Sequence, residues 1–203
     1  PSITNVSDSP MTTYVQVAGD SNHNTKDCGS KTVTLTKKAD TVSITAKTAT
    51  YTGSAITANT ATSESGSSIT YTYYSTTDCS GTALTSAPTN VGNYSVKAVS
   101  AGNGNYSSGN KCVTHTITKG NPTITLSDKS ATYTGSNIAI GNASAKNPNG
   151  SAVTLTYSYK YYSNNTCTTE VTSHANVGTY YAKATSSATS NLNSASSGCA
   201  KLT

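Results

Sequence analysis

Short runs in which apolar and polar residues alternate are the dominant pattern along this 203-residue chain. The run from Val42 to Ala46 places apolar side chains at every second position among Thr and Ser, and the same period recurs at 69–73, 94–98 and 113–117. A period of two with one apolar face is typical of strands in an antiparallel sheet that has one side in water. Because Gly, Ser and Asn turns separate the runs, the sequence predicts an all-β protein of antiparallel β-sandwiches.

The composition agrees with strands and indicates thin cores. Thr and Ser supply 71 of the residues, Val, Ile and Leu only 26, and Tyr occurs 14 times while Phe and Trp are absent. All 13 basic residues are scattered lysines and the net charge is +5, so a nucleic-acid binder is not expected. No apolar run approaches the roughly 18 residues of a membrane span.

Internal repetition is the strongest signal in the chain. Residues 49–56 and 131–138 share seven of eight positions at an offset of 82. A Tyr-rich segment follows each, at 69–74 and 155–162, and we align Ile69 with Leu155. The motif Asn-Val-Gly-x-Tyr then occurs once in each copy.

This repetition predicts two full repeats, 39–119 and 120–203, and the C-terminal part of a preceding repeat at 1–38. The chain therefore reads as a piece of a longer array that opens inside a repeat. Within 1–38 we expect strands at 14–18 and 32–37. The linkers around Lys37–Asp40 and Lys119–Pro122 are short, so the repeats are expected to lie end to end in a rod.

Asn-Val-Gly-x-Tyr has the spacing of the tyrosine corner of immunoglobulin-like domains, in which the Tyr hydroxyl bonds to the backbone just upstream. We assign this buried structural role to Tyr94 and Tyr180, and to Tyr14 by alignment.

The repeated Ala-Thr-Tyr-Thr-Gly-Ser, the run Ala-Pro-Thr-Asn-Val-Gly-Asn-Tyr at 87–94 and the closing Thr-rich strand resemble the bacterial immunoglobulin-like repeats of the MBG or YDG type. The resemblance covers 39–203 well and 10–38 in part. It implies tandem domains that form a stalk or adhesive fibre in large secreted or surface-anchored proteins, and it implies no catalytic residues.

Each full repeat holds two cysteines at equivalent places, separated by 33 and 32 residues. This equal spacing favours the disulfides Cys79–Cys112 and Cys167–Cys199 over other pairings. Zinc is the alternative, but no C-x-x-C pair or Cys/His cluster is present. Disulfides would indicate an oxidising compartment, and hence an extracellular, cell-surface or secreted protein.

Cys28 occupies the slot of the second cysteine of a repeat. Counting back from Tyr14 places its expected partner just outside this chain. We therefore expect Cys28 to bond to a cysteine upstream in the parent protein or in a neighbouring subunit, or to be free.

The sequence contains no constellation that predicts catalysis, a metal site or a cofactor. There is no G-x-S-x-G elbow and no D-x-D-x-D-G calcium loop. His115 alternates with apolar neighbours and is expected to be structural. We predict that the protein is not an enzyme.

Two functions remain open. In the first, the chain is a stalk or filament segment whose partners are neighbouring repeats or neighbouring subunits of a fibre. In the second, Tyr-rich faces or end loops bind a glycan or host protein; Tyr74 and Tyr162 break the alternation and could point outward. The alternative for these tyrosines is that they fill the core in place of Phe and Trp. A ligand-binding unit would usually differ from its neighbours, whereas the two copies retain the same elements, which favours the stalk.

N-x-[ST] sequons permit glycosylation without requiring it, since a chain this rich in Asn, Ser and Thr contains several by chance. They lie at Asn5, Asn93, Asn105, Asn142, Asn149 and Asn164.

Overall fold

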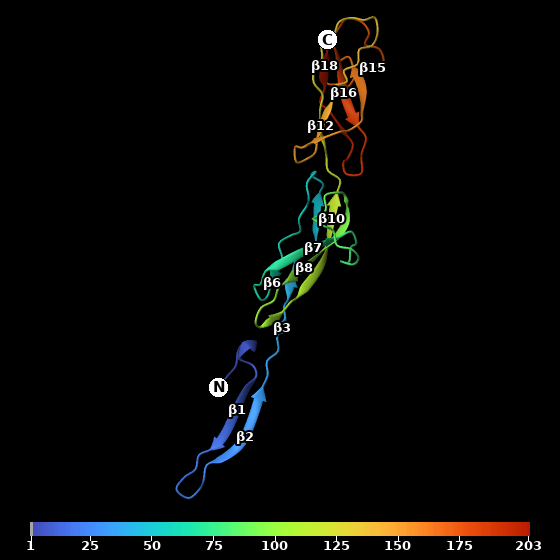
Figure 1. The fold of residues 1–203 in the computed structure, drawn as a ribbon. Helices are drawn as coiled ribbons and strands as arrows, with labels where there is room; N and C mark the ends of the chain where they lie inside the picture. The colour runs from blue at the N-terminus through green and yellow to red at the C-terminus, as the bar shows by residue number, and fades with distance from the viewer. Residues whose placement is uncertain (1) are drawn as a thin grey trace.

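The computed structural model describes residues 2–203, which are almost entirely β, with one short 3₁₀ turn, η1 (Val6–Asp8). Figure 1 shows three successive groups of strands between the N- and C-termini. In chain order the strands are β1 (Met11–Val17), β2 (Lys26–Val33), β3 (Lys38–Ala39), β4 (Val42–Ser43), β5 (Lys47–Thr50), β6 (Thr62–Ser63), β7 (Ile69–Tyr74), β8 (Gly92–Ser100), β9 (Tyr106–Ser107), β10 (Asn110–Thr118), β11 (Thr123–Thr125), β12 (Ser144–Lys146), β13 (Ala152–Val153), β14 (Tyr157–Tyr162), β15 (Glu170–Val171), β16 (Tyr180–Ser186), β17 (Ala195–Ser196) and β18 (Ala200–Leu202).

The first group is an antiparallel hairpin of β1 and β2. The predicted strand over 32–37 is wrong in its bounds, because β2 ends at Val33. In the middle group the corresponding strand β10 is paired on both sides, by β8 and β5. β2 pairs only with β1 within residues 2–203, so its continuation has no second neighbour to hold it extended.

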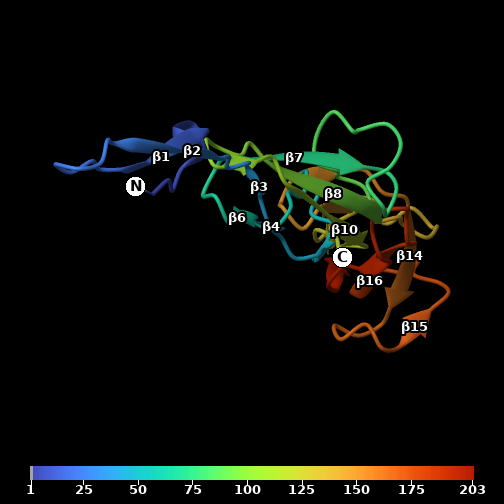
Figure 2. The ribbon, with the colours of Figure 1, turned by 90° about the horizontal axis from the view of Figure 1, so that it is seen from below.

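The middle group is organised around a four-stranded sheet of order β5-β10-β8-β7. β8 and β10 are the longest strands and pair antiparallel from Asn110–Val99 to Ile117–Gly92. Figure 2 shows β7, β8 and β10 side by side. Two short pairs, β4 with β6 and β3 with β9, complete the group.

The last group repeats this framework. β16 takes the place of β8 and pairs antiparallel with β14 on one side and with β18 on the other. β15 pairs antiparallel with the end of β14, and β17 pairs with the far end of β16. A second sheet, of order β11-β12-β13, belongs to the same group.

We call the three groups of strands the first, middle and last units, and the middle and last are the full units. A parallel contact closes each full unit, so the expectation of antiparallel sheets is wrong in this respect. β5 runs parallel to β10, with Lys47 opposite His115. In the last unit a parallel bridge joins Lys129 to Leu202. Lys47 and Lys129 are 82 residues apart, the repeat offset. Parallel neighbours need a crossover connection, and here the remaining strands of the unit provide it.

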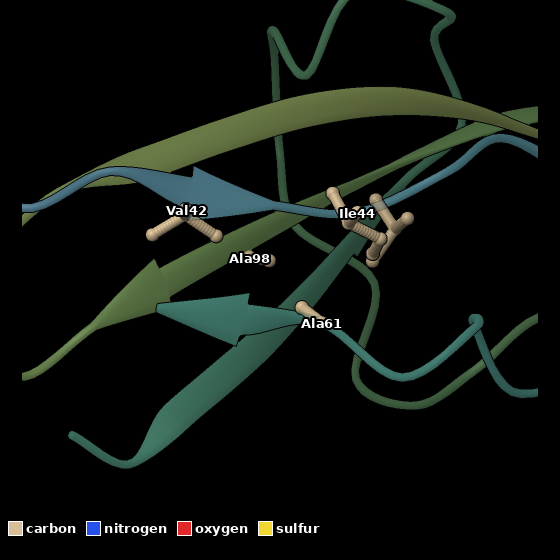
Figure 3. Close-up of a cluster of buried hydrophobic side chains, with 5 residues drawn as sticks. Val42, Ile44, Ala61 and Ala98 are labelled. Carbon is tan, nitrogen blue, oxygen red and sulfur yellow. The ribbon is translucent and has the colours of Figure 1, made fainter. Parts of the chain in front are cut away.

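The core of the middle unit is small and aliphatic. Val42, Ile44, Ala61, Val96 and Ala98 form one buried cluster (Figure 3). Partly buried residues, including two from β7, pack against it. The cluster explains how β4 and β6 are held against the main sheet, because Val42 of β4 and Ala61, just before β6, pack on Val96 and Ala98 of β8.

The last unit uses even smaller side chains at its centre. Ala182, Ala184 and Ala200 are fully buried, and Ile124 and Ile140 pack on them. Tyrosines of β14 pack against both clusters. The thin aliphatic core expected from the composition is thus supplemented by Tyr rings.

The Tyr-rich strands align differently from the sequence prediction. Tyr73 lies opposite Val96, and Tyr161 lies opposite Ala182, the residue that matches Val96 in the repeat. The structural offset between these strands is therefore 88, and Ile69 corresponds to Tyr157 rather than to Leu155. Extra residues before β14 shift the strand, and the shared x-Tyr-x-Tyr pattern hides the shift because it repeats every two positions.

Candidate functional site: the junctions between units

One asparagine from each full unit forms a pair of hydrogen bonds with the preceding unit. In the first junction the side-chain Oδ1 of Asn105 accepts from the backbone N–H of Val6, at 2.9 Å, and its Nδ2 donates to Oδ1 of Asn5, at 2.9 Å. The amide thus bonds an Asn-Val dipeptide through both of its polar atoms.

The second junction repeats this contact. Oδ1 of Asn191 accepts from the N–H of Val91 at 2.9 Å, and its Nδ2 donates to Oδ1 of Asn90 at 2.9 Å. Asn105 and Asn191 are both half-buried. The two junctions therefore use the same donor and acceptor atoms at positions 86 residues apart.

A tight turn presents each of these asparagines. In the turn 103–106, Oδ1 of Asn103 accepts from the backbone N–H groups of Asn105 and Tyr106. In the turn 189–192, Oγ1 of Thr189 accepts from the N–H groups of Asn191 and Leu192. Asn and Thr are suited to this position because their short side chains can cap backbone N–H groups two and three residues ahead.

The linker of each unit runs beside its own turn. The backbone N–H of Lys38 donates to the carbonyl of Asn105, and that of Gly120 donates to the carbonyl of Asn191, both at 3.0 Å. The preceding lysines add a second contact, since the ammonium groups of Lys37 and Lys119 donate to carbonyls of the same two turns. Linker and turn thus form one bonded element.

The repeated Tyr-Thr-Gly-Ser motif contributes to the second junction. The carbonyl of Thr52 accepts from the N–H of Asn149 at 3.1 Å, and Oγ of Ser54 accepts from Asn149 Nδ2 at 2.9 Å. Gly53 has φ +96°, and a Cβ there would lie 2.9 Å from Nδ2 of Asn147. Glycine suits this position because it adopts the positive φ without strain and leaves room for the side chain of Asn147.

Sequence reasoning missed these asparagines. The available signal was the Asn-Val dipeptide, which occurs at 5–6, 90–91 and 176–177. The last two were interpreted only as part of a tyrosine corner, and Asn5 only as a sequon. The dipeptide at 5–6 lies further from the start of the following strand than the dipeptides at 90–91 and 176–177 do, and this difference obscured the match.

The tyrosine-corner assignments have three different outcomes. The hydroxyl of Tyr94 donates to the carbonyl of Asn90 at 3.1 Å, and a Cβ on Gly92 would lie 3.1 Å from the Tyr94 ring. Tyr94 is half-buried rather than buried. Tyr180 is also half-buried, but its hydroxyl has no hydrogen bond to any described residue; its ring packs edge-on against His174 at 6.0 Å.

Tyr14 is not a corner residue, because its side chain is 74% exposed. The turn that follows its strand corrects the alignment. Tyr14 lies six residues before Asp20, as Lys97 lies six before Asn103. The place of Tyr94 is therefore taken by Met11, nine residues before Asp20.

The Tyr94→Phe variant is expected to lose roughly 1 kcal/mol of unfolding free energy, because removal of the hydroxyl leaves the Asn90 carbonyl without its hydrogen-bond donor. Tyr180→Phe is the matched control and should change stability by less than about 0.5 kcal/mol. Chemical denaturation of each variant measures both values. Equal losses at the two positions would contradict the assignment.

Both disulfides expected from the cysteine spacing are present, Cys79–Cys112 and Cys167–Cys199. The first cysteine of each pair has a positive φ, +60° at Cys79 and +51° at Cys167, which is uncommon for a residue other than glycine. The two repeats therefore share the left-handed backbone conformation at the first cysteine of each bridge. Cys28 is free and exposed.

The Tyr-rich strands use their hydroxyls inside the units. The Tyr73 hydroxyl accepts from the N–H of Ala58 at 2.8 Å, and that of Tyr71 accepts from Ala61 at 2.7 Å. Tyr161 accepts from Ile140 in the matching place of the last unit. Tyr74 and Tyr162, for which both an outward position and a core-filling role were open, are both half-buried. Through their hydroxyls, Tyr71, Tyr73 and Tyr161 hold the neighbouring segment to the sheet.

His115 is fully buried, and neither ring nitrogen has a hydrogen-bond partner among residues 2–203. Its ring packs edge-on against Tyr73 at 5.8 Å. Burial lowers the pKa of His115, and the nearby positive charge of Lys47 lowers it further. Leu202 takes this position in the last unit. His174 is buried as well and stacks on Tyr161 at 3.8 Å.

In the His115→Leu variant, the stability of the middle unit is expected to depend less on pH. The folded pKa lies below the unfolded value of about 6.5, so the unfolded chain binds more protons between the two values and stability falls as pH drops below about 6.5. The melting temperature, followed from pH 7.5 to 5, should fall less in the variant than in the unaltered protein. Identical slopes would contradict this role of His115.

The sequons divide into three groups. Asn5, Asn105 and Asn149 make side-chain contacts at the junctions, so a glycan on any of them would occupy a junction. Asn93 and Asn142 are exposed. Asn164 uses its side chain to close the loop 164–169, which contains Cys167.

Within residues 2–203, no group of three or more His, Cys, Asp or Glu side chains is placed to hold a metal ion. No helix in the described part of the chain is long and apolar enough to cross a membrane.

No protein-family model and no curated protein matches the chain. Among solved structures, Drosophila N-cadherin EC1-4 is similar at 14% identity and a TM-score of 0.32. The similarity covers 95% of this chain and 57% of that one, so this chain spans just over half the length of the cadherin structure.

Proposed function

We propose that this chain is a structural segment of an extracellular stalk or filament, built of tandem immunoglobulin-like repeats of the MBG or YDG type. Its repeats are residues 39–119 and 120–203, preceded at 1–38 by the last part of another. The observation that carries the proposal is the repeated junction, in which Asn105 and Asn191 make the same two hydrogen bonds to an Asn-Val dipeptide.

The junction contacts restrict how one unit can move on the next. Each hydrogen bond contributes only about 0.5–1.5 kcal/mol, but several act together over a short distance. In the second junction the covalent linker, the amide of Asn191 and the contacts of Asn149 join the two units at three separate points. Three separated points define an orientation, which a stalk requires.

The two disulfides support a location outside the cytoplasm, because such bonds persist in oxidising compartments. We propose that the protein is secreted or displayed at a cell surface and that it has neither catalytic activity nor a cofactor. Its partners would be further repeats of its own kind. The hydrogen-bonded hydroxyls of Tyr71, Tyr73 and Tyr161 favour this role over an adhesive Tyr-rich face.

Small-angle X-ray scattering of dilute protein tests the proposal. We expect an elongated particle whose units extend end to end. Replacing both Asn105 and Asn191 by Ala should broaden the distance distribution, while Asn142→Ala, on an exposed loop, should leave it unchanged. A compact particle with units packed side by side would contradict the proposal.

A further inference from the structure

The turn that presents Asn105 and Asn191 occurs a third time, at Asp20–His23. Oδ1 of Asp20 accepts from the backbone N–H groups of Asn22 and His23, at 2.8 and 2.7 Å. The N–H of Asp20 donates to the carbonyl of His23, at 2.9 Å. Each of these bonds has a counterpart in the turns 103–106 and 189–192. Asn22 therefore has the position of Asn105 and Asn191.

This third turn lies at the tip of the β1–β2 hairpin and is exposed. Asn22 is exposed, and the side chains of Asp20 and His23 are 66% and 79% exposed. By contrast, Asn105 and Asn191 are half-buried against the preceding unit, and Leu192, the counterpart of His23, is 2% exposed.

The partner surface also occurs a third time, at Asn176–Val177. The first two copies, Asn5–Val6 and Asn90–Val91, are each bonded by an asparagine turn, and Val6 and Val91 are half-buried. Val177 is 86% exposed. A surface pocket of about 110 Å³ lies beside it, lined by residues that include Tyr133, His174 and Tyr180.

The Tyr-Thr-Gly-Ser motif shows the same difference between the bonded and the exposed surface. Tyr51 is half-buried where the next unit contacts the motif, whereas its counterpart Tyr133 is 60% exposed. The end of the last unit thus has the groups that the middle unit uses at its junction, and they are open.

We propose that Asn176–Val177 binds the Asp20–His23 turn of a second copy of this chain, in head-to-tail order. Asn22 Oδ1 of the second copy accepts from the N–H of Val177, and Asn22 Nδ2 donates to Oδ1 of Asn176. A second copy is the occupant because its turn repeats the bonds of the two docked turns and is exposed. Within residues 2–203 one such turn and one such dipeptide are exposed, so association through them propagates along a line. The idea extends the proposed stalk function to assembly between chains.

A complementation experiment tests the proposal on the full chain. Asn22→Ala removes the turn contact and keeps the dipeptide, while Asn176→Ala does the reverse. Sedimentation velocity of the unaltered protein should show a sedimentation coefficient that rises with concentration. Each variant alone should remain monomeric, and an equimolar mixture should form only 1:1 dimers. Asn24→Ala, two residues from Asn22 on the same hairpin, is the control and should behave like the unaltered protein.

Concentration-dependent amide shifts in NMR spectra locate the contact, and the signals of Val177 N–H and the Asn22 side chain should move together. If the signals of residues away from these sites coincide with those of the unaltered protein, the variant is folded. A protein that stays monomeric up to millimolar concentration would overturn the proposal. So would association that survives both single substitutions, which would indicate pairing through the exposed apolar residues of the hairpin. Either result leaves the scattering test of the stalk unaffected, because that test uses the dilute monomer.

Discussion

Replacing Cys79 and Cys112 together by serine is expected to lower the unfolding free energy of the middle unit by roughly 3–4 kcal/mol. The bridge spans 33 residues, and in the chain-entropy model a loop of this length restricts the unfolded chain by about that amount. The loss is large for a unit whose buried cluster consists of two alanines, two valines and an isoleucine. We expect the middle unit to unfold at a clearly lower denaturant concentration.

Two controls separate the bond from the side chains. Reduced but unsubstituted protein retains both cysteine side chains and should show most of the loss. Cys28→Ser changes a free, exposed thiol and should alter stability by less than about 0.5 kcal/mol. A double variant as stable as the unaltered protein would show that the bridge does not support the unit.

The Ile117→Ala variant is expected to destabilise the middle unit by about 2–5 kcal/mol, the range for truncating a buried aliphatic side chain. Ile117 is 1% exposed and is the largest of the fully buried side chains. It lies on β10, the strand that joins β8 to β5, so a cavity there weakens the contact that closes the unit.

A graded series makes this prediction sharper. Ile117→Val should cost only about 0.5–1.5 kcal/mol, and Thr114→Ala, at an exposed position of the same strand, should be nearly neutral. Equilibrium denaturation gives the order. If alanine and valine at position 117 had equal effects, the residue would not fill the core as the structure places it.

Much of the fold could be predicted from the sequence, because the strands alternate with a period of two and the repeats confirm one another. The cysteine pairs followed from equal spacing in two copies. His115 was expected to be structural, since it alternates with Val113 and Ile117 on one strand, and it is buried. These features are local or appear twice, and the pattern of residues is enough to find them.

The remaining features depend on contacts that the alternation does not encode. The parallel pairing of β5 with β10 joins residues about 68 apart, and no local pattern marks its direction. The shift between Tyr73 and Tyr161 was hidden by a motif that repeats every two residues. Tyr14 was misassigned because the segment 1–38 has a different spacing between its dipeptide and its strand.

The junction asparagines were the most important omission. Asn105 and Asn191 lie in polar loops, and 19 asparagines in the chain make any one of them inconspicuous. What distinguishes them is the turn around each and the dipeptide it contacts on another unit. Those groups are about 100 residues away in the sequence.

Backbone ¹⁵N relaxation of the dilute protein tests the central proposal, that the units form a stalk, most directly. If the junctions hold the units in line, the amides of 39–119 and 120–203 should fit one axially symmetric diffusion tensor, with a long axis shared by both units. Replacing Asn191 by Ala should reduce this shared anisotropy. Separate tensors for the two units in the unaltered protein, each with the correlation time of a domain of about 80 residues, would contradict the account.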